Sequence, residues 1–414
     1  MKSLVVLALA VSVSTMAQVQ WSGFGRHQTA LRPLEQGDWS MIQNALSLNL
    51  ENRSDSKAFK ADFFISHNIG DSTLDWRLRQ LYMDLNFDCC DFRLGKQQVI
   101  WGKADGVFIT DVVSPKDLSE FLLPDFAEIR QGITALTSNV FVGNHTLSLV
   151  LVPQFTPTIA PEAGSIWHVA PPAPAGVRVS MDASQKDVAI EAANSEVFGR
   201  WSAILESIDF EVMAGWMWDD DPSLHISKRF AHVNSANGQM VLDSLVVSPR
   251  HHRLAVGGGS MSSTLAGFVL KGEGAFYYDK RFQSADPAAE DGLVSGNYLH
   301  TMLGASYAIS GVDFGFQFVQ KYLMDYDSFY QDKEFQNMIT AMIRKSLLRE
   351  TLYLELFSYV GLDDQDALIR PSIGYDISDG LRMTLGANLF YGDSGSFGQY
   401  DQNDMLYGKL AYYF

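Results

Sequence analysis

The sequence predicts an all-β protein: a transmembrane, antiparallel, up-and-down β-barrel of about 18 strands, with 16 as the alternative. Three observations predict this fold. The chain begins with a segment typical of a secretory signal, continues in segments that alternate between apolar and polar residues, and connects them by turns and loops of two different lengths.

The first residues, "MKSLVVLALAVSVSTMA", indicate export. Lys2 precedes an apolar stretch from Leu4 to Val13, and the small residues Thr15 and Ala17 are typical of a cleavage site before Gln18. A membrane anchor would need roughly 20 apolar residues, about twice the length of this stretch. We therefore expect residues 1–17 to be a cleaved signal peptide and residues 18–414 to form a single barrel domain.

The distribution of apolar residues supports one continuous barrel. Hydrophobic residues make up 47% of the chain and aromatic residues 12%, but they are spread over short alternating segments. No later apolar run is long enough for a spanning helix, and no linker rich in proline, serine or charge divides the chain.

The C-terminal segment "MLYGKLAYYF" shows the alternation most clearly. One face carries Leu406, Gly408, Leu410, Tyr412 and Phe414. The segment resembles the last strand of bacterial outer-membrane barrels, which the barrel-assembly machinery recognises by a terminal aromatic residue. The resemblance implies that Tyr412 and Phe414 form such a signal; an ordinary edge strand is the alternative.

Other segments repeat the pattern and are separated by connections of two lengths. "LRMTLGANLFY", "ALIRPSIGYDI" and "IDFEVMAGWMW" each place apolar side chains on one face and polar or small ones on the other. Very short links at Cys89, Gly143, Glu206, Ser310 and Ser378 alternate with longer ones. In bacterial barrels the short turns are periplasmic and the long loops external, which places both termini on the periplasmic side.

The charge balance excludes one class of partner. The chain has 31 Lys and Arg against 48 Asp and Glu, so nucleic acid is not an expected partner. Many acidic residues fall in expected external loops, near Asp220, Asp327 and Asp364. Solvation by water is the favoured interpretation of these residues, and binding of divalent cations is the alternative.

Strand phase also predicts charged groups on the lumen wall. These are Arg77, Arg79, Arg93, Lys271, Glu273, Lys321, Glu355, Arg370 and Arg382. Two interpretations are equally supported. The charges could tune which solutes pass, or they could pair across the lumen and stiffen the wall.

Catalytic and metal-binding patterns are weak, so the sequence predicts no catalytic residue, no metal site, no cofactor and no enzyme activity. Nine histidines include the adjacent pair His251 and His252, which we expect to face water near a loop, but no nucleophile motif accompanies them. The adjacent Cys89 and Cys90 lack zinc-ligand spacing, and their redox state is not determined by the sequence.

The segment "RLGKQQVIWGKADGVFITDVVSPKDL", residues 93–118, changes character midway. It begins as a strand and continues in a loop, where Ser114 and Pro115 favour the start of a short helix with an apolar face at Leu118, Phe121 and Leu122. We expect this external loop to fold into the lumen as a constriction or a plug. The candidate residues for that role are Trp101, Lys103, Asp105, Asp111, Asp117 and Glu120.

In the plug interpretation Trp101 anchors the loop at the membrane interface, and Gly102 and Gly106 allow the backbone to turn. At these residues the chain resembles a porin-like family of Gram-negative outer-membrane barrels that carries W-G-K-x-D-G followed by T-D-x-x-x-P-x-D. The matching run covers under a tenth of the chain. The resemblance implies a bacterial outer-membrane location, contact with outer-membrane lipid, an envelope-transport role and cooperation with periplasmic lipid-transport partners.

Together these observations predict a channel or porin-like protein for the passive passage of small or amphipathic solutes. The alternative is a barrel that transports lipid or hydrophobic compounds with periplasmic partners, or a surface scaffold that does not conduct. The solute and the oligomeric state are not determined by the sequence.

Overall fold

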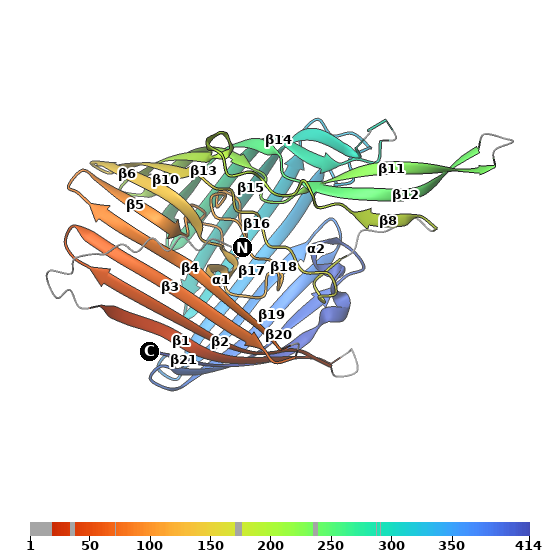
Figure 1. The fold of residues 1–414 in the computed structure, drawn as a ribbon. Coiled ribbons are helices and arrows are strands. Elements are labelled where there is room, and N and C mark those ends of the chain that lie inside the picture. Colours follow the sequence, from red (N-terminus) through yellow and green to blue (C-terminus); the bar gives the residue numbers. More distant parts are fainter. Residues whose placement is uncertain are drawn as a thin grey trace.

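In the computed structural model the chain forms a closed antiparallel β-barrel (Figure 1). The structure describes residues 19–33, 38–70, 72–169, 176–234, 239–286, 288–289 and 291–414. The expected signal peptide, residues 1–17, lies outside the described residues. No helix among the described residues is long and apolar enough to cross a membrane.

Eighteen strands of the described chain form the barrel wall, which confirms the predicted number. The first nine are β1 (Gln20–Arg32), β2 (Asp38–Arg53), β3 (Lys57–Asn68), β4 (Thr73–Asn86), β5 (Cys90–Gln97), β6 (Ile133–Val142), β7 (His145–Val152), β9 (Glu196–Ile204) and β10 (Ile208–Trp218). The others are β13 (Arg253–Leu265), β14 (Phe268–Gln283), β15 (Leu293–Ile309), β16 (Val312–Leu323), β17 (Phe335–Leu347), β18 (Leu352–Gly361), β19 (Asp366–Ser378), β20 (Leu381–Tyr391) and β21 (Met405–Tyr413).

The first and last strands pair and close the ring. β1 and β21 are antiparallel, with Phe24 opposite Tyr413, and the backbone N–H of Gly23 donates to the carbonyl of Phe414 over 2.9 Å. Closure gives every strand of the wall a hydrogen-bonded neighbour on each side, over at least part of its length. We call the end of the barrel that holds both termini the turn end, and the opposite end the loop end.

Short turns connect strands at the turn end, at the positions that the sequence predicts. The turn of Ser310 and Gly311 has positive φ at both residues, 52° and 71°, as a two-residue hairpin turn requires. The thiols of Cys89, in the turn between β4 and β5, and of Cys90, the first residue of β5, are both free.

The predicted alternation between the two faces is confirmed. In β20, Leu385 is exposed on the outer face whereas Asn388 is buried toward the lumen, and in β21 Leu410 is exposed whereas Met405 is buried. An apolar outer face and a polar inner face are what a lipid-facing barrel requires.

Three strands lie outside the barrel wall. β11 (Ser223–Asn234) and β12 (Gln239–Arg250) form an antiparallel hairpin, and β8 (Arg178–Met181) pairs with β12 in parallel. This small sheet extends away from the loop end (Figure 1). Arg250 thus ends a strand of the projecting sheet, whereas Val197 lies in barrel strand β9.

A short helix lies in the loop between β5 and β6, but not at the predicted residues. It is α1 (Phe126–Ile129), inside the ring of strands (Figure 1). The helix expected at Ser114 and Pro115 does not form. The backbone N–H of Leu118 donates to Ile159, and the carbonyls of Pro115 and Lys116 accept from Gln131 and Ile159. Tertiary hydrogen bonds therefore use the groups that a helix would need.

Three further one-turn elements complete the described structure: η1 (Ala192–Asn194), α2 (Gly395–Gly398) and η2 (Asp401–Asn403). The last two lie in the loop between β20 and β21 at the loop end.

Candidate functional site

The loop of residues 98–132, which we call the inner loop, leaves the wall at the end of β5 and fills part of the lumen. Gln97 starts it: its side-chain amide donates to the carbonyl of Ala135 (2.9 Å) and its carbonyl accepts from Thr137 (2.8 Å). The next turn is fixed where the backbone N–H of Val99 donates to the hydroxyl of Ser114 (2.8 Å). Side-chain partners thus replace the strand pairing that ends there.

Apolar side chains of the inner loop pack against the inner wall. Trp101, Ile109, Val112 and Val113 are buried in one cluster with residues of β6, β7, β9, β10, β13 and β14. Trp101 is only 4% exposed and lies edge-on to Phe198. The prediction that Trp101 anchors the loop at the membrane interface is therefore wrong, because its ring is enclosed within the barrel.

The carboxylate of Glu273, on β14, is the most heavily used anchor of the inner loop. It accepts from the backbone N–H groups of Lys103, Ala104 and Thr110, and from the hydroxyl of Thr110 (2.9 Å). Glu273 is buried, and four donors compensate for its lost solvation. The ammonium of Lys103 lies 3.4 Å from the carboxylate of Glu211 on β10.

The tip of the inner loop is held by β14 again and by two further strands, β16 and β18. The backbone of Asp105 exchanges two hydrogen bonds with the side chain of Gln317 on β16, of 2.9 and 2.6 Å. The carboxylate of Asp105 pairs with Lys271 on β14 (2.8 Å). The carbonyl of Gly106 accepts from the hydroxyl of Tyr359 on β18 (2.9 Å), and Gly106 has a φ of 83° with no room for a side chain against Phe357.

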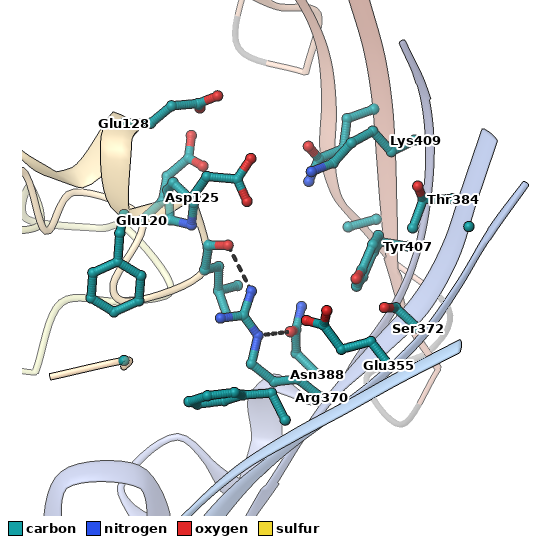
Figure 2. A pocket seen from close by; sticks show the side chains of 18 of the residues that line it. Glu120, Asp125, Glu128, Glu355, Arg370, Ser372, Thr384, Asn388, Tyr407 and Lys409 are labelled. Atoms are coloured by element: carbon teal, nitrogen blue, oxygen red, sulfur yellow. Dashed lines mark hydrogen bonds between the residues drawn. The ribbon is translucent and has the colours of Figure 1, made fainter. Parts of the chain in front are cut away.

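The returning half of the inner loop is tied to β19 on the far wall. The guanidinium of Arg370 donates to the carbonyls of Leu122 (3.0 Å) and Leu123 (2.8 Å), and to the side chain of Asn388 (3.0 Å). Figure 2 shows Arg370 reaching from the wall toward the loop, with Asn388 beside it. A planar guanidinium suits this fork of acceptors, which a lysine could not reproduce.

The remaining predicted loop residues fix the loop to itself and to nearby strands. The carboxylate of Asp111 accepts from the guanidinium of Arg130 (2.5 Å). The carboxylate of Asp117 pairs with Arg77 on β4 and accepts from the backbone N–H of Ser119 (3.0 Å). Glu120 accepts from the side chain of Gln43 on β2 (3.2 Å). Burial raises the pKa of the Glu120 carboxyl above its ordinary value, against the opposing influence of Arg26.

A cavity of about 660 Å³, which we call the axial cavity, lies between the inner loop and the wall formed by β17 to β21 and β1. Glu120, Asp125 and Glu128 line it from the loop side (Figure 2). Lys409 and Arg370 line it from the wall side. No described carboxylate forms an ion pair with Lys409 or Arg370. Glu355 also lines the wall side and Glu128 pairs with Arg26, so the cavity carries charges of both signs, with Glu120 and Asp125 of the loop opposite Lys409 and Arg370 of the wall.

The predicted lumen charges all lie on the inner face, and most are paired. The pairs are Arg93 with Asp84, Arg79 with Asp62, Arg77 with Asp117, Lys271 with Asp105, Glu355 with Arg344 and Arg382 with Asp376. Lys321 instead lies over the rings of Phe282 and Tyr298. Thus most of these groups support the wall or the inner loop, and Arg370 remains directed at backbone carbonyls.

Sequence reasoning missed several residues of the site. Arg26 on β1 forms a two-pronged pair with Glu128 of α1, with contacts of 2.8 and 3.0 Å. Gln317 and Tyr359 hold the loop tip but are uncharged. The inward strand phase could have identified Gln317 and Tyr359, whereas no local signal pairs Arg26 with a residue about a hundred positions away.

An aromatic cluster covers part of the loop end. Phe121 of the inner loop stacks on Trp167 of the loop after β7, with ring centres 5.9 Å apart, and both contact Tyr400. The hydroxyl of Tyr400 donates to the carbonyl of Trp167 (3.2 Å). Three loops far apart in the sequence therefore close over this side of the lumen.

Some acidic and histidine residues of the outer loops are not solvated as predicted. Asp219 is buried against Lys280, and burial raises the pKa of Asp220 well above its ordinary value. His251 is buried and bonds the backbone of Asp219 (2.7 Å), so the expectation that it faces water is wrong. Among the described residues, no group of three or more His, Cys, Asp or Glu is arranged to hold a metal ion.

A closed barrel of 18 antiparallel strands with a loop folded into its lumen defines a porin-like fold, and known structures share it. Pseudomonas aeruginosa OccK2 (OpdF), solved in complex with glucuronate, aligns with a TM-score of 0.53 and 10% identity over 96% of this chain and 98% of that one. Acinetobacter baumannii OccAB3 aligns with a TM-score of 0.52 and 10% identity over 96% and 100%. The outer membrane protein OpdK of Pseudomonas aeruginosa aligns with a TM-score of 0.53 and 8% identity over 96% and 99%.

The sequence itself shows the family. A model of the family described as "Protein of unknown function (DUF1302)" matches residues 43–341, which include the inner loop, and the chain belongs to this family. No curated protein matches the sequence significantly.

Proposed function

We propose that this protein is a channel of the bacterial outer membrane for the passive passage of small or amphipathic solutes, with the inner loop as its constriction. The observation that carries the proposal is the path of that loop. It leaves the wall between β5 and β6 and is fixed to β14, β16, β18 and β19, with the axial cavity of about 660 Å³ beside it.

The charges of the axial cavity give the constriction its selectivity. Glu120, Asp125 and Glu128 face Lys409 and Arg370 across the cavity (Figure 2). Opposed rings of charge orient a dipolar solute and set the relative permeability of anions and cations. Because carboxylates of the loop lie opposite Lys409 and Arg370 of the wall, the channel favours solutes that bear both a cationic and an anionic or polar end.

The outer membrane, its lipid and the barrel-assembly machinery are parts of the same proposal. The apolar outer face fits a lipid bilayer, and Phe414 at the end of the chain stacks on Tyr412 with ring centres 6.3 Å apart. The turn end would then face the periplasm and the projecting sheet would lie outside the cell.

Conductance in planar lipid bilayers tests the proposal. The folded protein should give steady ionic steps, and deletion of residues 103–121 should increase the step size. Folded protein that gives no steps, or a deletion that folds and leaves the steps unchanged, would contradict the constricted channel. Substitution of single anchors of the loop repeats the test while it preserves the apolar packing.

A second candidate function is the transport of lipid or hydrophobic compounds together with periplasmic partners. A cavity that reaches the outer face of the barrel at β4 favours it. Silence in the bilayer together with uptake of an amphiphile would support this candidate, whereas silence without uptake would indicate a scaffold.

A further inference from the structure

The barrel wall is incomplete on one side of β4. Residues Leu81–Asn86 of β4 pair with β5, but β5 ends at Gln97, which already pairs with Ile133 of β6. The part of β4 nearer the loop end pairs with β3 alone. Among the described residues, no strand pairs with the other edge of β4 between Trp76 and Gln80. Such an edge inside a membrane barrel needs either a partner or a polar environment.

The backbone of the inner loop meets this edge at Gly132, and on the lumen side Arg77 pairs with Asp117 while Arg79 donates to the carbonyl of Ala127. Gly132 lies so close to the carbonyl oxygen of Arg79 that a side chain at position 132 would collide with it. Arg79 is also the site of a bulge, where the pairing with β3 shifts by one residue. Beyond Gly132 toward the loop end, Asp117 and Ile159, which bridge each other, form the other side of the gap.

A cavity of about 600 Å³, which we call the lateral cavity, lies at this gap. Neighbouring side chains of a strand point to opposite faces. Trp76 and Leu78 lie on the outer face and Arg77 and Arg79 on the inner face, yet all four line the same cavity. A cavity lined by both faces of one strand must extend around the edge of that strand, so it connects the lipid-facing surface with the lumen.

The lining of the lateral cavity defines the chemistry of a ligand. Trp76, which is 72% exposed, Leu78 and Ile159 give the outer rim an apolar surface. Lys96 lies at the same rim, opposite Leu81 on the outer face, and forms no ion pair within the described part of the chain. A lysine on the lipid face costs roughly 2–4 kcal/mol at the bilayer midplane and less near the interface, unless an anion accompanies it.

The lateral cavity also leads toward the axial cavity. Arg26, Glu120, Pro124, Glu128 and Arg130 line both, so the segment around α1 is a partition between them. The aromatic cluster of Phe121, Trp167 and Tyr400 meanwhile covers part of the axial entrance at the loop end. A solute that enters the lateral cavity from the membrane would therefore reach the segment around α1 without passing through the loop end of the barrel.

We propose that the gap beside β4 is a lateral portal that takes a single-chain anionic amphiphile, with an acyl tail and a carboxylate head, from the lipid leaflet into the lumen. The inference deepens the proposed function, because it depends on the barrel being a transport protein and names a substrate class and a route. Lys96 meets the carboxylate at the rim while Trp76, Leu78 and Ile159 contact the tail. The volume of about 600 Å³ lies within the usual range of small-molecule sites, roughly 300–1,000 Å³.

Photochemical labelling with a diazirine-bearing fatty acid tests the route. The full-length barrel in liposomes should be labelled at peptides that contain Trp76–Arg79 and Ile159, in excess over the other lipid-facing strands. A diazirine-bearing phospholipid serves as the comparison. Equal labelling of all outer strands by the fatty acid, or preferential labelling of the portal by the phospholipid alone, would overturn the proposal.

Substitution of Lys96 tests the assigned head-group contact. The Lys96→Gln protein should bind the fatty acid with a dissociation constant about tenfold higher than that of the wild type, because one charge-assisted contact is lost. The matched control is Lys345→Gln. Lys345 neighbours the lumen-facing Arg344 in β17 and so lies on the outer face, far from the gap. Equal affinity of Lys96→Gln and the wild type would remove Lys96 from the site.

Blocking the portal after folding avoids the risk that a variant does not fold. In a background in which Cys89 and Cys90 are changed to serine, Leu78→Cys labelled with a bulky maleimide should abolish fatty-acid uptake, whereas labelled Leu385→Cys on β20 should not. Ionic conductance should persist in both. Unchanged uptake by the labelled Leu78→Cys protein would refute the portal and leave the channel intact, whereas loss of conductance in the unlabelled protein would refute the channel itself.

Discussion

Substitution of Glu273 by glutamine should release the inner loop and increase the conductance of the channel. One carboxylate oxygen accepts from the backbone N–H groups of Lys103 and Ala104, and the other from the N–H and hydroxyl of Thr110. A glutamine amide presents one oxygen and one NH₂ group in the same place. If the amide oxygen faces Lys103 and Ala104, the Thr110 hydroxyl can turn to accept from the NH₂ group, but the N–H of Thr110 then faces another donor.

The cost follows from the burial of these groups. Each buried donor left without an acceptor costs about 1–3 kcal/mol. One such donor weakens the attachment of the loop by roughly 1–3 kcal/mol, and about 1.4 kcal/mol changes an equilibrium constant tenfold. The detached state of this segment should therefore gain a factor of about five or more relative to the wild type.

Single-channel recording in planar bilayers measures the effect directly. The Glu273→Gln protein should show larger or more frequently interrupted steps than the wild type, at unchanged expression and folding. Glu355→Gln is the control, because Glu355 also faces the lumen but pairs with Arg344 on the wall. If both variants give wild-type steps, Glu273 does not hold the constriction and the reasoning fails.

Three other changes test the same anchors. Arg370→Lys should increase the conductance steps, because an ammonium cannot reproduce the two hydrogen bonds of the guanidinium to the loop carbonyls. The control Arg382→Lys should change the steps little. Equal steps in the two variants would contradict the role of Arg370. Gly106→Ala should loosen the loop tip, since φ is 83° and Phe357 occupies the space, and proteolysis of the folded protein should detect a newly accessible loop; unchanged resistance would contradict it. The raised pKa of Glu120 favours its protonated form when the inner loop is attached to the wall. The attachment is therefore strongest at acid pH and weakens as the pH rises through that pKa, so conductance should rise with pH. Glu120→Gln should remove this pH dependence.

Local patterns in the sequence predict the barrel because the physics of the wall is local. Alternation with a period of two specifies which side chains face lipid, and a hairpin turn such as Ser310 and Gly311 needs only its own backbone conformation. The strand number, the turns and the inward phase of the lumen charges follow from these rules. The inner loop is predicted for a similar reason, since the strand pattern stops at Gln97 and resumes near Arg130.

The errors arise where distant contacts override local preference. Ser114 and Pro115 carry the signals of a helix start, but the backbone of Asp117 and Leu118 bonds Ile129 and Ile159 instead. Trp101 has the composition of an interfacial anchor and is enclosed with Phe198. These residues were assigned by their own chemistry, whereas their positions depend on which wall strands the loop meets.

The sequence by itself determined a closed barrel, its strand number and the loop that leaves the wall after β5, because pleating, turn geometry and the cost of polar groups in lipid act within a few residues. Only the tertiary structure decided what holds that loop and where the wall is open. Glu273 meets Thr110, and Arg370 meets Leu122, across the lumen. The gap beside Trp76 exists because β5 ends before β4 does, and such a difference becomes visible only when the strands are placed side by side.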